Sequence, residues 1–423
     1  MKHIVLFGAG RSATVLIDYL KQTANSIVCR VTVADADFNV VQSKTGEHPL
    51  VRPMALDIHD EAGRGELVRS ADVVISLMPP ALHHLVALDC LRYGKHLLTA
   101  SYVDEQIRGM EKEIASKGLL FLCEMGLDPG IDHMSAMQLI NRIRTNGGTI
   151  RSFRSHCGGL VAPESDTNPW HYKVSWNARN VITAGKPGAL YRENGNVVSL
   201  GYTQLFDHTR TVSPEPGVTY SWYPNRDSLK YISTYHLEEA DTFIRTTLRH
   251  PEFCFGWKNV IELMLTDEEK VYETDGLTLA GFFRQHFEKY GFGEWLSQML
   301  MSRLSYAREM MEKLMALMDA EQQAEKQGTE KPGEVLLVNE KGELDAVEVE
   351  DIKDKAAETV ALKMHEANLS MKQLFFLGMD DDTTLINRGR CSAADVMQFI
   401  FETRLALLPE DKDLVVMLHE IDY

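Results

Sequence analysis

The sequence predicts an α/β protein in which an N-terminal Rossmann domain, a doubly wound parallel sheet, is followed by a larger α+β domain. Three observations predict this fold. From residue 3 to about 123, short apolar runs alternate with helical patterns, as in parallel strands joined by right-handed crossovers. A glycine-rich turn follows the first apolar run. The length of 423 residues exceeds the usual size of one hydrophobic core, so two domains are expected.

The first domain is expected over residues 1–129 as an NAD(P)-binding Rossmann domain. Its apolar runs have the length and bounding residues of strands, at 4–7, 31–34, 73–77, 96–99 and 119–123. The stretches between them have helical spacing, at 12–21, 59–68, 82–93 and 104–117. A further short strand is expected just before Asp57.

The second domain is expected over residues 130–423, where the pattern changes. It is predicted to bind the substrate and to carry the contacts of a homodimer. Its helices are predicted at 131–145, 253–265, 277–290 and 295–318. Residues 319–359 are strongly charged and poor in aromatic side chains, so they are predicted to form a solvated surface insertion.

The composition limits the classes of partner. The chain has 44 Lys and Arg against 61 Asp and Glu, a formal net charge of −17. Such an acidic protein is expected not to bind nucleic acid or anionic membranes, which leaves a small-molecule substrate as its partner. The six cysteines are scattered without C-x-x-C spacing, so neither a metal site nor a disulfide framework is expected.

The cellular location is predicted from the apolar segments. The strand pattern begins at His3, and the apolar stretch 73–91 is interrupted by two prolines and two histidines. We therefore expect no signal peptide and no membrane span, and we predict a cytoplasmic enzyme.

The turn after the first strand has the pattern of a dinucleotide-binding fingerprint. Gly8 would permit the tight turn, Gly10 would let a pyrophosphate approach the backbone, and Ala13 would allow helix and strand to pack closely. The phosphates would lie on the N–H groups of the helix start, around Arg11 and Ser12. Glycine-rich turns also occur without a ligand, but this one stands in the required strand–turn–helix context.

The choice of cofactor is predicted from the end of the second strand. A carboxylate at Asp35 would accept hydrogen bonds from the adenosine ribose and repel a 2′-phosphate, whereas the alternative is a loop aspartate or helix cap. Since Ala36 and Asp37 follow it, there is no adjacent arginine to hold a 2′-phosphate. NAD is favoured over NADP. Asp57 is a second candidate for the adenine edge of the site.

Two loops are expected to flank the nicotinamide, because the carboxyl ends of parallel strands line the ligand crevice. They are residues 76–80 and 99–102. Tyr102 offers a phenol that could donate a proton or orient a substrate, and the alternative is an exposed loop tyrosine.

Asp128 stands where the first domain ends and the helix at 131–145 begins. Asp128 followed by Pro129 is the usual pair at a helix N-cap and first helical position. A carboxylate at a strand end could also bind the ammonium group of a substrate, and the two roles are compatible.

Several longer motifs follow one another between residues 124 and 249. They are EMGLDPGIDH at 124–133, CGGL at 157–160 with later Pro-Glu and Asn-Pro pairs, YKVSW at 172–176, YPNRDS at 223–228 and TLR at 247–249. Together they resemble the saccharopine dehydrogenase family, in its L-glutamate-forming saccharopine reductase branch. The resemblance runs over nearly the whole chain and is weakest from about 319 to 375.

The resemblance implies a set of substrate contacts. Saccharopine would contact Ser101, Tyr102 and Asp128, and its carboxylates would bind to the second-domain residues Arg226, Thr247, Leu248 and Arg249. Arginine suits such carboxylates because its planar fork pairs with both oxygens. The expected catalytic residues are Tyr102, Asp128 and Cys157. Tyr102 or Asp128 would assist proton movement at the bridging amine. The alternative for Cys157 is a small residue packed beside two glycines.

The resemblance also implies where the cofactor lies. Its contacts would be Gly8, Gly10, Arg11, Ser12, Ala13, Asp35, Asp57, Met78, Ala100, Ser101, Leu127, Asp128, Pro129 and Asn177.

The chain departs from the family pattern at two places. The second strand of the family usually ends in Cys-Arg, suited to NADP, where this chain has Asp35 and Ala36. The family also continues beyond the strand at 413–420 with a segment that returns to the first domain. We therefore expect this strand to pair within the second domain and Tyr423 to lie near the domain junction. An apolar patch larger than a few hundred Å² would then be exposed on the first domain.

The resemblance implies that the enzyme forms or oxidises saccharopine by hydride transfer between an imine and a nicotinamide cofactor. One alternative is a reductase of a polyamine-derived imine, similar to carboxynorspermidine synthase. Arg226 and Arg249 argue against it, since they suit an anionic substrate. Another is a non-catalytic dinucleotide-binding protein, which would not need Tyr102, Asp128 and Arg226.

Overall fold

The protein is described here by a computed structural model that covers residues 1–175, 177–207, 209–295, 297–302, 304–305, 308, 312, 315, 334–338 and 344–423. These residues form two compact units. The first contains Met1–Cys157, Lys230–Phe243 and Met417–Tyr423, and the second contains Gly158–Leu229 and Ile244–Val416. The units differ in extent from the domains expected from the sequence, whose boundary at residues 129 and 130 stays a prediction.

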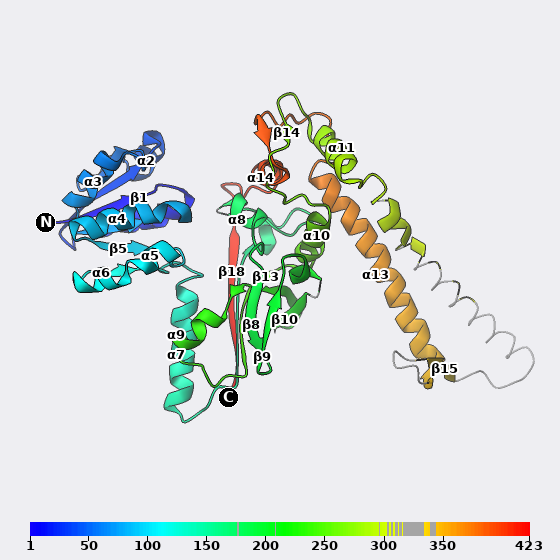
Figure 1. Cartoon of the computed structure of the whole chain (residues 1–423). Coiled ribbons are helices and arrows are strands. Elements are labelled where there is room, and N and C mark those ends of the chain that lie inside the picture. The colour runs from blue at the N-terminus through cyan, green and yellow to red at the C-terminus, as the bar shows by residue number, and fades with distance from the viewer. Residues whose placement is uncertain are drawn as a thin grey trace, which may run out of the picture. The chain divides into compact units, whose positions relative to one another are not determined.

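A six-stranded parallel sheet forms the centre of the first unit, as the sequence predicted (Figure 1). The order across the sheet is β3 (Val51–Ala55), β2 (Cys29–Asp35), β1 (Lys2–Phe7), β4 (Val73–Ser76), β5 (His96–Thr99) and β6 (Phe121–Leu122). The order reverses direction between β1 and β4. In doubly wound sheets this switch point is where a dinucleotide binds, outside the carboxyl ends of the strands.

Helices connect the strands of this sheet. They are the 3-10 turns η1 (Arg11–Ala13) and η2 (Pro80–Leu82) and the helices α1 (Thr14–Thr23), α2 (Phe38–Thr45), α3 (Glu61–Ser70), α4 (His83–Tyr93), α5 (Glu105–Gly109) and α6 (Glu111–Ser116). Helix α2 was not expected from the sequence, because it is short and has little amphipathic pattern; it is started by Asp37, whose side chain accepts from two backbone amides. The single helix expected at 104–117 is instead two short helices that meet at Met110.

Both faces of the sheet are buried. Val5 and Phe7 belong to one apolar cluster, with Val74 and Leu97, whereas Leu6 belongs to a second cluster on the other face. Neighbouring residues of a strand point to opposite faces, so an all-apolar strand needs cover on both sides. Beyond β5, large apolar side chains are more exposed, at Leu120, Leu122, Met125, Leu127, Ile131 and Met134. The area of the expected apolar patch stays a prediction.

Helix α7 (Ile131–Thr145) begins as predicted, but its start is built differently. The N-cap residue is Gly130, and the Asp132 carboxylate accepts its N–H at 2.7 Å. The expectation that Asp128 and Pro129 cap the helix is therefore wrong. Gly130 has φ +150, and a Cβ there would lie 2.0 Å from the Gly126 carbonyl oxygen, so the turn requires glycine.

A mixed eight-stranded sheet follows in the chain. Its main path is β10 (Arg210–Glu215), β11 (Val218–Pro224), β13 (Thr242–Arg249), β7 (Ser152–Val161) and β18 (Asp413–Asp422). Beside this path lie β8 (Ala189–Glu193), β9 (Asn196–Leu200) and β12 (Arg226–Asp227). The strand expected at 413–420 is thus β18, drawn in red in Figure 1, and its pairing within residues 130–423 is confirmed. The position of Tyr423 relative to a domain junction stays a prediction.

The remaining elements lie between the strands of this sheet along the chain, and two of the short strands among them pair with each other in a separate sheet. The short ones are η3 (Pro163–Ser165), α8 (Ala178–Ile182), η4 (Thr203–Phe206), η5 (Leu229–Tyr231), α9 (Ile232–Tyr235), β14 (Tyr272–Glu273) and β17 (Arg390–Cys391). The longer helices are α10 (Pro251–Glu262), α11 (Leu279–Tyr290), α13 (Val349–Phe376) and α14 (Ala393–Arg404).

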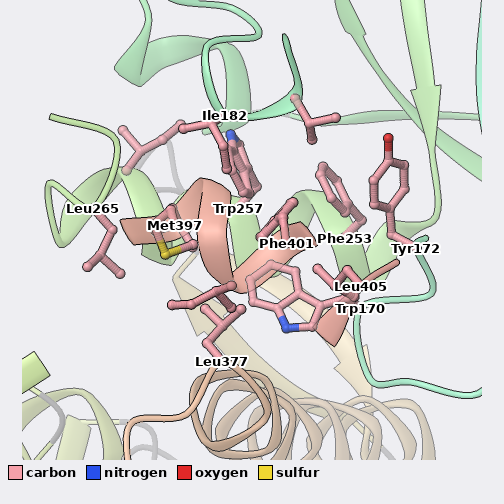
Figure 2. Close-up of a cluster of buried hydrophobic side chains, with 14 of the residues drawn as sticks. Trp170, Tyr172, Ile182, Phe253, Trp257, Leu265, Leu377, Met397, Phe401 and Leu405 are labelled. Carbon is pink, nitrogen blue, oxygen red and sulfur yellow. The ribbon is translucent and has the colours of Figure 1, made fainter. Parts of the chain in front are cut away.

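The core of the second unit is aromatic (Figure 2). Phe253 and Trp257 of α10 stack with ring centroids 5.5 Å apart, and Phe401 of α14 meets Trp257 edge to face. Trp170 packs against Phe253 and donates its indole N–H to the Gln373 carbonyl of α13. Such pairs bury large apolar areas while the indole stays hydrogen-bonded.

The expected helix at 295–318 and the charged segment at 319–359 lie largely outside the described residues. Within that segment, β15 (Glu334–Val338) pairs antiparallel with β16 (Leu344–Glu348), and α13 begins at Val349. Across the described part of the chain, none of the helices is both long enough and apolar enough to span a bilayer.

Candidate active site

The glycine-rich turn fits a pyrophosphate. Gly8 has φ +98, and a Cβ there would lie 2.8 Å from the Leu77 carbonyl oxygen, so no larger residue can stand there without strain. At Gly10 a Cβ would meet nothing within 4 Å, which leaves the backbone open to a ligand. Neither η1 nor α1 has a side-chain cap, and an open helix start attracts anions. Ala13 is fully buried at this start, as the fingerprint requires.

Asp35 and Lys44 lie beside this turn. One Asp35 oxygen accepts the Ala9 N–H at 2.8 Å, and the other accepts the Asp37 N–H at 3.2 Å. The Lys44 ammonium of α2 donates to the Gly10 carbonyl at 2.6 Å. Burial lowers the pKa of Lys44, while the Asp35 carboxylate acts in the opposite direction. Sequence reasoning missed Lys44, because α2 itself was not expected.

The other expected cofactor residues of the first unit follow strand ends. Asp57 is exposed after β3, where its side chain accepts the His59 N–H, and Met78 is half-buried after β4. Ala100 follows β5. Its carbonyl oxygen packs closely on Gly126, since a Cβ added at Gly126 would lie 2.9 Å from that oxygen. Leu127 is exposed and Pro129 is buried in the turn before α7. These positions all follow strands of the parallel sheet at their carboxyl ends, as in a dinucleotide site.

Tyr102 and Asp128 form a pair. The Tyr102 hydroxyl donates to Asp128 Oδ1 at 3.0 Å, and both residues are half-buried. The alternative of an exposed loop tyrosine is therefore wrong. A phenol hydrogen-bonded to a carboxylate can pass a proton to or from a third group that reaches either oxygen.

Glu124 connects the loop of Tyr102 to the loop of Asp128. Its backbone N–H donates to the Ser101 carbonyl at 3.1 Å, and its side chain accepts the Val103 N–H at 3.2 Å. Glu124 has φ +59, a strained conformation for a residue other than glycine, which these bonds on both sides of Tyr102 hold in place.

Two side chains contact the Glu124 carboxylate, and a third contacts one of these two. His133 Nε2 lies 2.9 Å from it, and the Tyr231 hydroxyl donates to it at 3.1 Å. The second nitrogen of His133 contacts the Tyr235 hydroxyl at 2.6 Å. Burial raises the pKa of Glu124, but the hydrogen bonds from His133 and the Val103 amide outweigh it, so the pKa lies below its usual value. Sequence reasoning did not single out these residues; the only signal for them is that Glu124 and His133 are the first and last residues of the motif EMGLDPGIDH.

Ser101 contacts a buried histidine. His83, the first residue of α4, lies between the hydroxyls of Ser76 and Ser101, each 2.9 Å from one ring nitrogen. Ser76 ends β4, and Ser101 follows β5.

The residues expected to bind the substrate carboxylates lie in the second unit. Arg226 is exposed on β12 and has φ +51. Thr247, Leu248 and Arg249 end β13, opposite Tyr223, Trp222 and Ser221 of β11. Leu248 is fully buried in the core, and its carbonyl accepts a hydrogen bond from the Arg249 guanidinium.

Arg249 is mostly buried among aromatic rings. Its guanidinium lies over Tyr172 at 5.3 Å and over Phe253 at 5.6 Å, and it donates to the Leu248 carbonyl at 2.8 Å. A guanidinium held by aromatic faces keeps its charge while it is partly withdrawn from water.

Two further expected residues have structural contacts of their own. Cys157 is buried in β7, next to Gly158, where a Cβ would lie 2.6 Å from the Leu248 Cβ. Asn177, in the second unit, caps α8 by accepting the Asn180 N–H at 3.3 Å. Among the residues that the structure describes, no group of three or more histidine, cysteine, aspartate or glutamate side chains could hold a metal ion.

Comparison with known proteins indicates the family of the chain. The family model described as the saccharopine dehydrogenase NADP binding domain matches residues 4–122, and the one described as the saccharopine dehydrogenase C-terminal domain matches residues 126–423.

Two curated relatives are named saccharopine dehydrogenase [NADP(+), L-glutamate-forming]. The one from Schizosaccharomyces pombe is 37% identical over 256 residues, which cover 60% of this chain and 56% of the relative. The one from Saccharomyces cerevisiae is 35% identical over 271 residues, which cover 63% of this chain and 59% of the relative. The match thus spans less than two thirds of the length of either relative.

A solved structure has the same fold. The apo histidine-tagged saccharopine dehydrogenase (L-Glu forming) from Saccharomyces cerevisiae aligns with a TM-score of 0.72 at 24% identity, over all of this chain and 81% of that one. With a glycine turn that fits a dinucleotide and two family models that together match almost every residue, the chain belongs to the saccharopine dehydrogenase family.

Proposed function

We propose that the protein is an oxidoreductase that forms or oxidises saccharopine, acting on a CH–NH bond. In the forming direction, the amine of glutamate condenses with 2-aminoadipate 6-semialdehyde, water leaves, and the resulting imine gains a hydride and a proton. The Tyr102–Asp128 pair carries the proposal, since it places a proton donor and a carboxylate beside each other in loops that follow the cofactor-binding sheet. The names of the relatives support the same reaction.

The residues of the chain would bind, orient and move protons. When bound, the nicotinamide cofactor supplies or accepts the hydride. The Asp128 carboxylate would attract the substrate ammonium, and the Tyr102 phenol, hydrogen-bonded to it, would move a proton at the bridging nitrogen. Glu124 would keep the two loops in register, so that phenol and carboxylate stay within reach of one nitrogen.

The carboxylates of saccharopine would bind to the second unit. Arg226 and Arg249 would supply the cations, and Thr247 would supply hydrogen bonds. Cys157 would lie near the reaction centre. An anionic substrate suits these arginines better than a polyamine does, so the saccharopine reaction is preferred over the reduction of a polyamine-derived imine.

For the cofactor, we infer a preference for NADP. The matching domain is described as NADP binding, and both relatives carry NADP(+) in their names. Asp35 alone favours NAD, but one of its oxygens is engaged by the Ala9 amide and Lys44 lies close by. An ammonium there can offset the repulsion between Asp35 and a 2′-phosphate. The homodimer and the cytoplasmic location expected from the sequence stay predictions.

The test is turnover of saccharopine by the purified protein, followed by the absorbance of the reduced cofactor with NADP and NAD in parallel. Tyr102→Phe and Asp128→Asn should each lower kcat about a hundredfold or more, since a positioned acid or base contributes on the order of 10²–10⁴ in rate. For Tyr102→Phe, affinity for reduced cofactor should stay within about twofold, because Tyr102 is not an expected cofactor contact.

The matched control is Tyr19→Phe, an exposed tyrosine of α1, which should turn over saccharopine normally. If the unaltered protein binds reduced cofactor and does not oxidise saccharopine, the proposed function is wrong, and a dinucleotide-binding protein without this activity is favoured.

A further inference from the structure

His83 is a buried histidine that the proposed reaction does not use. It is 3% exposed and lies at the carboxyl edge of the Rossmann sheet, between Ser76 and Ser101. Nδ1 lies 2.9 Å from Ser76 Oγ, and Nε2 lies 2.9 Å from Ser101 Oγ. Three polar groups thus form one row, which begins inside the fold and ends at a residue expected to contact both cofactor and substrate.

The direction of the hydrogen bonds follows from Ser76. Ser76 is fully buried, and within the described part of the chain its hydroxyl has no hydrogen-bond partner other than His83. If Nδ1 carried a hydrogen, the Ser76 hydrogen would have no acceptor, and a buried unsatisfied donor is costly. Ser76 therefore donates to Nδ1, and the single hydrogen of the neutral ring is on Nε2. Burial lowers the pKa of His83, against a smaller opposite effect of Asp104, which agrees with a neutral ring.

We propose that His83 is a positioning residue that makes the Ser101 hydroxyl accept one hydrogen bond from the histidine and donate its own hydrogen to a ligand. Nε2–H donates to Ser101 Oγ, so the Ser101 hydrogen is directed to the ligand. Among the described residues, no acceptor for that hydrogen lies within hydrogen-bond distance. The group that Ser101 recognises is therefore an acceptor oxygen of a carboxamide or carboxylate. Whether this oxygen belongs to the nicotinamide carboxamide or to a substrate carboxylate rests on the proposed function. The direction of the hydrogen bonds between His83 and Ser101 does not.

A second buried histidine offers a matched control. His3 is 5% exposed, its Nε2 lies 2.9 Å from the Thr32 hydroxyl, and its Nδ1 lies 3.0 Å from the Ser70 carbonyl. Burial lowers its pKa as well. His3 lies near the amino end of β1, at the edge of the sheet away from the expected ligand crevice.

The first experiment determines the tautomer in the free protein. Nitrogen-15 NMR of histidine-labelled protein, with the His83 signals assigned by their loss in His83→Gln, should show a neutral ring protonated at Nε2. A ring protonated at Nδ1, or a doubly protonated ring at neutral pH, would overturn the proposal. This result does not depend on whether saccharopine is the substrate.

The second experiment measures coupling between His83 and Ser101. His83→Phe and Ser101→Ala should each weaken either reduced-cofactor affinity or the saccharopine KM by about tenfold, as loss of one ligand hydrogen bond does. The double variant should lose no more than either single variant. His83→Gln, whose amide can still donate, should recover most of the loss. A change in cofactor affinity assigns the acceptor to the carboxamide, and a change confined to the saccharopine KM assigns it to the substrate.

Two controls separate positioning from packing. His3→Phe should lower the Tm about as much as His83→Phe and leave both ligand constants unchanged. Where His83→Phe does not fold, Ser76→Ala replaces it, since it removes the donor that fixes the ring and should weaken the same constant by a smaller factor. Additive losses in the double variant, or unchanged constants in every folded His83 and Ser76 variant, would overturn the proposal. Intact coupling in the cofactor titration without saccharopine turnover would refute only the proposed function.

Discussion

Lys44 is the residue with the most direct bearing on cofactor choice. Its ammonium lies at the Gly10 carbonyl, and its charge acts on Asp35. The second strand of the family usually ends in Cys-Arg where this chain has Asp35 and Ala36, so under the proposed function a cation facing a 2′-phosphate would come from Lys44 in the following helix, α2. A cation beside the adenosine ribose would strengthen binding of NADP relative to NAD, because it attracts the 2′-phosphate. A carboxylate at the same place would have the opposite effect.

Lys44→Ala is therefore expected to weaken NADPH binding about tenfold and to change NADH binding by less than about twofold, because one charge-assisted hydrogen bond is lost. Asp35→Ala should have the opposite effect and strengthen NADPH binding. Fluorescence titration of each variant with both reduced cofactors measures this. Lys112→Ala, an exposed lysine of α6, is the control. Equal losses for NADPH and NADH in Lys44→Ala would show that Lys44 only stabilises the turn.

Glu124 makes stability depend on pH. Its folded pKa lies below the ordinary value of 4.5, because His133, the Val103 amide and Tyr231 favour the carboxylate more than burial disfavours it. A depressed pKa contributes stability that is present above the unfolded value and is lost as the pH falls through the folded value.

We expect Glu124→Gln to lower the free energy of unfolding by about 2 kcal/mol at neutral pH, as for hydrogen bonds to a charged group. The difference from the unaltered protein should shrink as the pH falls below about 4.5. Thermal or denaturant unfolding from pH 7 to pH 3 measures it. Glu113→Gln, at an exposed glutamate of α6 that pairs with Lys117 just after the helix, should change stability by less than about 0.5 kcal/mol. A difference for Glu124→Gln that is constant with pH would show that its charge is irrelevant.

At the scale of elements, the β1–α1 turn separates two requirements for glycine. Gly8 needs a positive φ and close contact with the Leu77 carbonyl, whereas Gly10 has open space around its Cα. The first requirement is set by the folded chain, and the second would be set only by a ligand that approaches the backbone.

Gly8→Ala should therefore destabilise the free protein by about 1–3 kcal/mol, the usual range for a residue held in an unfavourable backbone conformation. Gly10→Ala should leave stability within about 0.5 kcal/mol and weaken reduced-cofactor binding at least about tenfold. Calorimetry of the free protein and fluorescence titration give the two numbers. A cofactor affinity unchanged in Gly10→Ala would place the pyrophosphate elsewhere.

At the scale of the whole molecule, each compact unit has an apolar core of its own. The two clusters of the Rossmann sheet lie in the first unit, and the aromatic cluster of Figure 2 lies in the second. Proteins of this size with separate cores commonly unfold in more than one step.

Calorimetry should therefore resolve two transitions, and reduced cofactor should raise the Tm of one of them. At a concentration of about 100 times Kd, binding stabilises the unit that holds the cofactor by about 2.7 kcal/mol. Gly8→Ala should lower that same transition, whereas Trp257→Phe, in the core of the second unit, should lower the other. One cooperative transition that shifts as a whole in both variants would contradict independent unfolding.

The sequence by itself determined the elements whose signals are local. Apolar runs predicted the parallel strands, glycine at positions 8 and 10 predicted the dinucleotide turn, and residues 131–145 were predicted as a helix that α7 confirms. Contiguous motifs were enough to indicate the family. These features depend on the side-chain period of a strand or helix and on the φ values that glycine permits, which are properties of neighbouring residues.

Only the tertiary structure decided which side chains meet across the sheet. Lys44 reaches Gly10 across 34 residues, His83 reaches Ser101 across 18, and Tyr231 reaches Glu124 across 107. Asp128 shows why local rules fail here, because the N-cap rule ignores a distant phenol that takes the same carboxylate. Such contacts depend on how crossover connections bring strand ends together, and no short stretch of sequence contains that information.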